Sequence, residues 1–220
     1  FTGNMAMGGT LGVTGTTTIG DGTSGVAKIN GGSSSSGQLI FMDAGTNRAR
    51  IGVPTGTTTL SLSGSNTLTG DVVITADGEV TMPTQPAFSA KVNSDQTNVA
   101  VGSDVTVVFG AEIYDVGSNF ASNTFTAPVT GKYQLSFMMY TQAIDSAATY
   151  VQMQISTSNR GYFIIFDPDF GQDATYWTFS LSILADMDAN DTAIVQYAQS
   201  GGSAQTDING NSYFTGFLAC

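Results

Sequence analysis

The sequence predicts an all-β protein in two parts, a repetitive β shaft followed by an antiparallel β-sandwich head. In the second half, apolar residues alternate with Gln, Ser and Thr at the period of an extended chain, and no stretch has a helical period. The first half consists mostly of Gly, Thr, Ser and Asn with isolated aliphatic residues. The 220 residues are 41% hydrophobic, and because the apolar residues gather in the second half, they suffice for a core there.

The charge of the chain restricts its partners. Only 10% of the residues are charged, and 17 Asp and Glu stand against 6 Lys and Arg. The net charge of −11 repels nucleic-acid phosphates and anionic membrane surfaces, and no basic cluster overrides it. No apolar run approaches the roughly 18 residues of a membrane span. We therefore expect no nucleic-acid binding and no membrane insertion. No signal peptide is recognisable, and the start at Phe1 rather than Met is compatible with a fragment of a longer chain.

Residues 1–82 are predicted to form the shaft. MAMGGTLGVTGTTTIG, from Met5, and LSLSGSNTLTGDVVIT, from Leu60, match one another at a constant offset. Such a repeat indicates short strands separated by glycine turns. Isolated aliphatic residues bury too little surface for one chain to fold, so we expect three chains to wind around a common axis and pool them. The alternative is a disordered linker, and GGSSSSG at 31–37 is typical of a flexible loop.

The head is predicted over residues 87–220, after a stiff hinge, PTQP, at 83–86. Neither hinge proline supports a helix interior or a central strand. Alternation of apolar and polar residues predicts strands at 105–109, around Tyr133, and at 150–156, 177–184, 192–198 and 212–219. Trp177 starts one of these strands and is expected to pack in the core.

A series of motifs runs through the head in a fixed order. The series comprises AFSAK at 87–91, F-x5-D from Phe109 to Asp115, Phe120, FTAPVTGKYQLSF at 125–137 and YFTGFL at 213–218. Its centre reads Phe125, Gly131, Tyr133, Leu135 and Phe137, with Leu135 where the pattern usually has Phe. In order and spacing the series resembles the globular head of complement component one q, which belongs with the tumour necrosis factor-like jelly rolls. The resemblance implies an eight- or ten-stranded jelly roll that assembles as a trimer, with both chain ends at the base and loops at the far apex.

The style of the first half, as in VTGTTTIGDG at 13–22, is similar to the shafts of bacteriophage tail fibres. Together the two resemblances imply a homotrimeric, extracellular virion fibre whose distal head binds a host cell-surface glycan or protein. Other virion proteins would bind through chain that precedes Phe1. The alternatives are a purely structural fibre or decoration protein with the head as a trimerisation cap, a capsule depolymerase, and a bacterial surface adhesin.

The chain has no histidine, which limits its chemistry. Ser-His-Asp and Cys-His catalysis and the commonest transition-metal ligands are excluded. Paired carboxylates beside aromatic rings, as in DPDFGQD at 167–173, are the remaining catalytic pattern, typical of glycosidases. A solvated turn or a binding loop is the preferred interpretation. We expect no enzyme and no cofactor.

Recognition is expected in the loops at the apex, over roughly 158–175 and 200–211. Aromatic faces stack on sugar rings, and Asn, Gln and Asp side chains hydrogen-bond hydroxyl groups. The alternative is that these are only polar loop residues. The candidate receptor-binding residues are Asp167, Asp169, Phe170, Gln205, Asp207 and Asn209.

DMDAND at 186–191 places oxygen ligands at alternate positions, as a calcium loop does. The full pattern fails, because Asp191 stands where glycine belongs and Tyr197 where the closing Glu belongs. We therefore expect a tight turn at the base and no bound metal. The single cysteine, Cys220, allows no disulfide within the chain, and we expect it to end a strand rather than to link chains.

Overall fold

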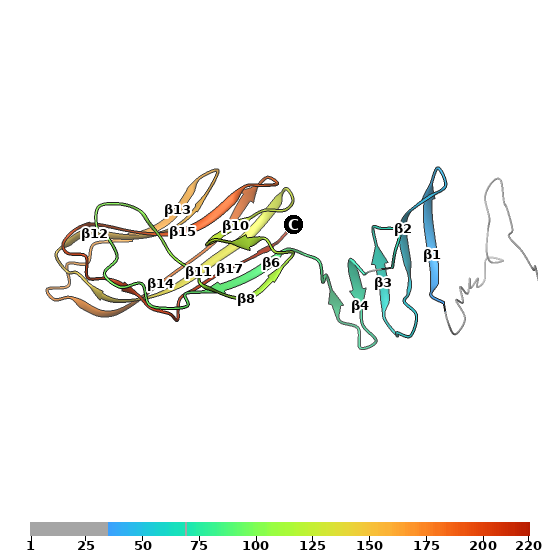
Figure 1. Ribbon diagram of the computed structural model, residues 1–220, viewed down its shortest axis with the longest axis horizontal. Coiled ribbons are helices and arrows are strands. Elements are labelled where there is room, and N and C mark those ends of the chain that lie inside the picture. Colours follow the sequence, from blue (N-terminus) through green and yellow to red (C-terminus); the bar gives the residue numbers. More distant parts are fainter. Residues whose placement is uncertain (1–34, 69) are drawn as a thin grey trace, which may run out of the picture. The chain divides into compact units, whose positions relative to one another are not determined.

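The computed structural model describes residues 35–68 and 70–220, and within them the chain forms strands and turns without a helix (Figure 1). This confirms the all-β prediction for the described residues, among which no helix could cross a membrane. The chain divides into two units, Phe1–Thr81 and Met82–Cys220. The first copy of the predicted repeat, from Met5, and the start of GGSSSSG lie outside the described residues.

The described part of the first unit is one antiparallel sheet in which each strand pairs with the next along the chain. Its second strand follows a tight turn in which Ala44 and Gly45 both have positive φ, and Gly45 adopts it without a Cβ penalty. Gly37, the last residue of GGSSSSG, begins the first strand. The strands are β1 (Gly37–Asp43), β2 (Thr46–Val53), β3 (Leu60–Ser63), β4 (Val72–Ile74) and β5 (Val80–Thr81).

The second unit is a two-layer antiparallel sandwich, as the alternation predicts (Figure 1). One layer has the order β13-β12-β15-β10-β9, with β7 also paired to β15. The other has the order β14-β11-β17-β6-β8, with β16 also paired to β11. The two main paths hold ten strands, and β7 and β16 are two-residue additions. The strands are β6 (Ala87–Lys91), β7 (Val105–Thr106), β8 (Ala111–Val116), β9 (Phe120–Ala121), β10 (Thr124–Thr126), β11 (Gly131–Ile144), β12 (Ala148–Thr157), β13 (Gly161–Phe166), β14 (Ala174–Met187), β15 (Thr192–Gly201), β16 (Asp207–Ile208) and β17 (Tyr213–Leu218).

The core between the layers explains the order of the motifs in the sequence. Phe88, from AFSAK, is fully buried and stacks on Phe125 and Phe120 at ring-centroid distances of 4.7 and 5.0 Å. Phe214, from YFTGFL, meets Phe88 edge-on at 5.0 Å, and Phe109 completes the cluster. Although these motifs are far apart in sequence, they supply rings to the same cluster.

Close approach of the backbone explains the motif glycines. A Cβ on Gly216 would lie 2.6 Å from Leu135 Cδ2 and 2.7 Å from Phe88 Cε1. A Cβ on Gly131 would lie 2.7 Å from the carbonyl oxygen of Cys220. Both positions lie where strands of the β11 layer meet a large side chain or the end of the chain, so only glycine fits without displacement.

Each of the six predicted head strands overlaps an observed one, although the strand predicted at 105–109 is a strand only at Val105–Thr106 and the one predicted at 212–219 only at Tyr213–Leu218. The alternation does not predict β6, β8, β9, β10, β16 or β13, and the last of these, β13 (Gly161–Phe166), falls inside the range expected to form an apex loop, 158–175. Its side chains alternate, with Tyr162 and Ile164 packed on the core and Phe163 exposed. The short run YFIIF lacks the polar spacers that identified the other strands.

Candidate functional site

The head has two ends, defined by the strand directions. β11 begins at the base end, beside Cys220, whose carbonyl accepts the Lys132 N–H at 2.7 Å, and it runs to Ile144 at the far end. The start of the head lies at the same end, because the Leu218 N–H donates to the Pro86 carbonyl at 2.9 Å. Both ends of the head chain therefore lie together at this end, which is the arrangement that the resemblance implies for the base (Figure 1). The far end is formed by the turn after β11, the loop 167–173 and the loop 201–206.

The predicted apex range 158–175 is wrong at its start. The turn 158–160 lies at the base end, because the Asn159 amide donates to the Asp186 carbonyl at 3.1 Å and to the Asp191 carboxylate at 2.7 Å. β13 then carries the chain the length of the sandwich, so only residues 167–173 of that range form a far-end loop.

The Asp173 carboxylate joins the three segments of the far end. Its Oδ1 accepts from the Ser146 backbone N–H at 2.9 Å and from the Ser146 hydroxyl at 2.8 Å. Its Oδ2 accepts from Gln205 Nε2 at 2.7 Å. These bonds, the Ser146 backbone bond foremost, lower the pKa of Asp173 from its ordinary value, so the carboxylate is the form that holds the loops.

Asp145, which is 5% exposed, makes a second connection at the far end. Its carboxylate accepts from the Ala147 N–H at 2.8 Å and from the Ser203 N–H. Gly202 passes so close that a Cβ there would lie 2.5 Å from Asp145 Oδ2. The turn after β11 and the loop 201–206 are therefore fixed to one another by a buried carboxylate.

An exposed stack of aromatic rings lies beside these loops. Trp177 stacks on Phe166 at 5.4 Å with an interplanar angle of 11° and on Phe170 at 5.3 Å with an angle of 24°. Trp177 is 41% exposed and Phe170 is 43% exposed, so the expectation that Trp177 packs in the core is wrong. Trp177 lies near the start of β14, which is an edge strand of its layer. Residues from Phe170 to Trp177 line a surface hollow of about 420 Å³.

The candidate residues divide between two places. Asp167, Asp169 and Phe170 share the loop 167–173, where Asp167 Oδ1 accepts the Asp169 N–H at 3.1 Å and both carboxylates are exposed. Gln205 belongs to the same end through its bond to Asp173. These four candidates are therefore brought together.

Asp207 and Asn209 serve a different connection. Asp207 Oδ1 accepts the Asn98 N–H at 2.8 Å, and Asn209 Nδ2 donates to Asp95 Oδ2 and to Gln142 Oε1, both at 3.3 Å. Both side chains are half-buried and fasten the segment 95–98 to the strands beside β16. Nothing local in SGGSAQTDINGN distinguishes them from Gln205, because their partners lie more than a hundred residues away or on another strand.

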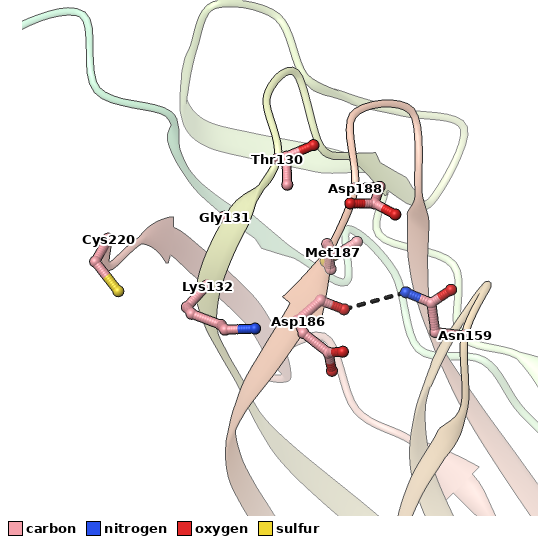
Figure 2. A pocket seen from close by; sticks show the side chains of 8 residues that line it. All are labelled: Thr130, Gly131, Lys132, Asn159, Asp186, Met187, Asp188 and Cys220. Carbon is pink, nitrogen blue, oxygen red and sulfur yellow. Dashed lines mark hydrogen bonds between the residues drawn. The ribbon is translucent and has the colours of Figure 1, made fainter.

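A hollow of about 300 Å³ lies at the base end (Figure 2). Lys132 and Asp186 face one another across paired strands, and Asp186 also forms an ion pair with Arg160 at 3.0 Å. The exposed thiol of Cys220 lies at its rim, beyond the end of β17. The lining residues are Thr130, Gly131, Lys132, Asn159, Asp186, Met187, Asp188 and Cys220.

Residues 186–191 end β14 and form a tight turn into β15, as predicted. The Asp191 carboxylate accepts from the Ser158 hydroxyl at 2.7 Å and the Asp188 N–H at 2.8 Å, and Asn190 has a φ of 75°. These bonds, the Ser158 bond foremost, lower the pKa of Asp191. Across the residues that the structure describes, no three Asp, Glu, His or Cys side chains converge in a way that could hold a metal ion.

Comparison with known proteins agrees with the core and its motifs. The sequence matches the family described as "C1q domain" over residues 87–219, which is more than half of the chain. No curated protein matches the chain. Among solved structures, the "Globular Domain of Zebrafish Complement 1qA protein" is similar, with 17% identity and a TM-score of 0.48 over 62% of this chain and 98% of that one. C1q domains are a non-enzymatic, ligand-binding fold and commonly form homotrimers. This chain, whose motifs build the same jelly-roll head, belongs to the C1q domain family.

Proposed function

We propose that this protein is a homotrimeric fibre protein of a bacteriophage virion, whose head attaches the particle to a glycan or protein on the host cell surface. The observation that carries the proposal is the far end of the head. There, exposed rings stand beside polar loops that buried and charged hydrogen bonds hold in place. The conformational cost of binding to such a surface is reduced, because its loops are ordered before a ligand arrives.

The outer face of the β14-β11-β17-β6-β8 layer supports a trimer. Leu184, Phe217 and Tyr114 point away from the core on this layer, and about half of each side chain is exposed. Large apolar groups on one outer face indicate a contact between proteins. A head whose family commonly forms homotrimers has two further copies to cover them.

The first unit supports a fibre rather than a free binding domain. A Gly/Thr-rich sequence with an internal repeat precedes the head, in the place where a shaft would hold the head away from a particle. Three heads on one shaft convert weak individual sites into strong attachment by avidity. Other virion proteins would bind chain on the N-terminal side of the shaft.

A competition experiment tests attachment. The purified full chain is expected to block adsorption of the virion that carries it, and the double variant Phe170→Ala/Trp177→Ala is expected to lose at least tenfold in blocking. Phe163→Ala is the matched control, because Phe163 is an exposed ring on the opposite layer. Equal blocking by parent and double variant would contradict a role for the aromatic stack.

A purely structural head is the second candidate. The internal bonds of Asp207 and Asn209 favour it, because these side chains already stabilise the head itself. A trimer that binds no host cell and never blocks adsorption would establish this candidate and exclude attachment by the head.

A further inference from the structure

One face of the sheet of the first unit is apolar along two rows of paired positions. Across the first four strands, Leu39 pairs with Ile51, Ile51 with Leu62, and Leu62 with Val72. Directly paired residues point to the same face of a sheet. One continuous aliphatic row therefore crosses β1 to β4, which lie side by side in Figure 1.

A second row runs parallel to the first on the same face. Leu60 pairs with Ile74, and Ile74 pairs with Val80. Val80 is 62% exposed, and Leu39 and Phe41 of β1, on the same face, are about half exposed. Neither row contains a charged or hydrogen-bonding side chain.

The opposite face has a different character. Arg50 donates to Gln38 Oε1 at 2.6 Å, and Ser63 Oγ accepts the Gly70 N–H at 2.7 Å. Ser61 and Ser63 on this face are buried, with Gly70 lying against them, and Arg50 Nε is buried without a hydrogen-bond partner. The apolar face is the more exposed of the two, because Leu39, Phe41 and Val80 are about half exposed or more.

The described residues of this unit supply only one layer, so the apolar face needs a cover from elsewhere. The face is also hollowed: Phe41, Ile51, Leu62 and Val72 line a depression of about 330 Å³ that can accept side chains. Its occupant must be apolar and must match two rows of aliphatic residues. A second copy of the same face meets both conditions.

The length of the connection favours copies of this chain as the occupant. Gln85 donates to the Leu218 carbonyl, and the Leu218 N–H donates to the Pro86 carbonyl at 2.9 Å, so the head holds the chain from Gln85 onward. Only residues 82–84 separate that point from the end of β5, a span of roughly 10 Å when fully extended. In a trimer of heads, three sheets would be tethered at high effective concentration.

We propose that the Leu39–Ile51–Leu62–Val72 face is the contact between three copies of this sheet, so that the shaft sheet is stable only within the trimer. The proposal rests on the trimer of the proposed function and adds to it which face is covered, and by what. Under this proposal the two units differ: the head folds around its own core, whereas three copies of the first unit's sheet together form one core.

Hydrogen exchange of the full chain, read by mass spectrometry, tests the proposal with two adjacent residues. Leu39 and Ile40 are both exposed aliphatic residues of β1, and they point to opposite faces. We expect protected amides in β1–β4 of the parent, at least tenfold faster exchange there in Leu39→Asp, and protection retained in Ile40→Asp. At the other edge, Val80→Asp and its neighbour Thr81→Asp form a second matched pair, for which the same contrast is expected.

The outcomes separate this proposal from the proposed function. If the full chain is a trimer but β1–β4 exchange freely, or if both members of each pair behave alike, the shared face is contradicted and the head trimer stands. If the chain is a monomer, both proposals fail. If the chain is a monomer in which Leu39→Asp alone opens the sheet, the cover comes from the same chain, and the proposal is likewise overturned.

Discussion

The head and the sheet of the first unit (β1–β5), called the shaft sheet after its proposed role, use the same alternation of apolar and polar residues with opposite results. In the head, Phe88, Tyr133 and Leu135 are fully buried between two layers that one chain supplies. In the shaft sheet, Leu39 and Phe41 occupy the equivalent inward positions of a strand but are about half exposed, because the described chain supplies one layer. Alternation therefore predicts which face of a strand is apolar, and not whether the same chain covers it.

The difference extends to how each unit orders its loops. Loops of the head are tied to distant segments by side chains such as Asp145, Asp173 and Asp207. In the shaft sheet, hydrogen bonds of the turns link near neighbours, as between Asp71 and Gly64 or Thr57 and Pro54. The head therefore ties its loops to its own distant segments, whereas under the proposal above the sheet of the first unit depends on what packs against it.

Replacing one phenylalanine in each unit gives the largest expected contrast. Phe88→Ala removes a fully buried ring from the centre of the aromatic cluster and should destabilise the head by about 3–5 kcal/mol. Phe41→Ala should leave the urea midpoint of the head unchanged, because Phe41 lies in the other unit. Circular dichroism during urea unfolding, with tyrosine fluorescence as a second probe, measures both. A head midpoint that moves equally in the two variants would break the comparison.

Gly216→Ala tests the close packing of the head with a smaller expected effect. The new methyl group would meet Leu135 Cδ2 and Phe88 Cε1 at less than 3 Å, so both side chains must move. Such overpacking should destabilise the head by about 1–3 kcal/mol in the same urea experiment. Gly171→Ala is the control for a new methyl group, because a Cβ there meets nothing within 4 Å, although its positive φ adds some backbone strain. A smaller loss for Gly216→Ala than for Gly171→Ala would contradict tight packing at this position.

Tyr197→Phe removes a single buried hydrogen bond, from the tyrosine hydroxyl to Gln199 Oε1 at 2.7 Å. Because Thr206 still donates to that oxygen, the loss should be only about 1 kcal/mol. Burial raises the pKa of Tyr197 to about 12, above its unfolded value near 10. The folded state therefore binds this proton more tightly, and the stability that results is present below pH 10 and lost as the pH rises from 10 to 12. The stability difference between parent and variant should shrink over that range, and a constant difference would contradict the role of burial.

Asp173→Asn should have the smallest effect, confined to the far end of the head. It removes the charge that holds Ser146 and Gln205, so amides in the turn 145–147 and the loop 201–206 should exchange faster. Because the pKa of Asp173 is lowered in the folded state, its contribution is present at neutral pH and is lost as the pH falls through the carboxyl range below about 4. Parent and variant should therefore converge in acid. Asp169→Asn, at an exposed carboxylate of the same loop, is the control, and faster exchange in that control as well would contradict a specific role for Asp173.

Much of the head could be predicted from the sequence, because its strands alternate cleanly and its motif phenylalanines and glycines sit at fixed spacings. β13 was missed because YFIIF is continuously apolar although its side chains alternate between core and solvent. The place of Trp177 at the start of a predicted strand favours the core, but β14 is an edge strand and Trp177 is 41% exposed.

The candidate site was predictable only in part. Composition and position in a loop identified Asp167, Asp169 and Phe170, which do lie together. The residue that joins the loops, Asp173, was present in the same motif but could not be distinguished, since its partners Ser146 and Gln205 come from two other segments. Asp207 and Asn209 have internal roles for the same reason: long-range hydrogen bonds leave no local pattern.

The mass of the full chain in solution, measured by light scattering at micromolar concentration, tests the central claim most directly. We expect a particle mass three times that of one chain, because both the outer face of the β11 layer and the aliphatic face of the shaft sheet need copies of the chain to cover them. A mass of one chain, unchanged across a hundredfold concentration range, would contradict it.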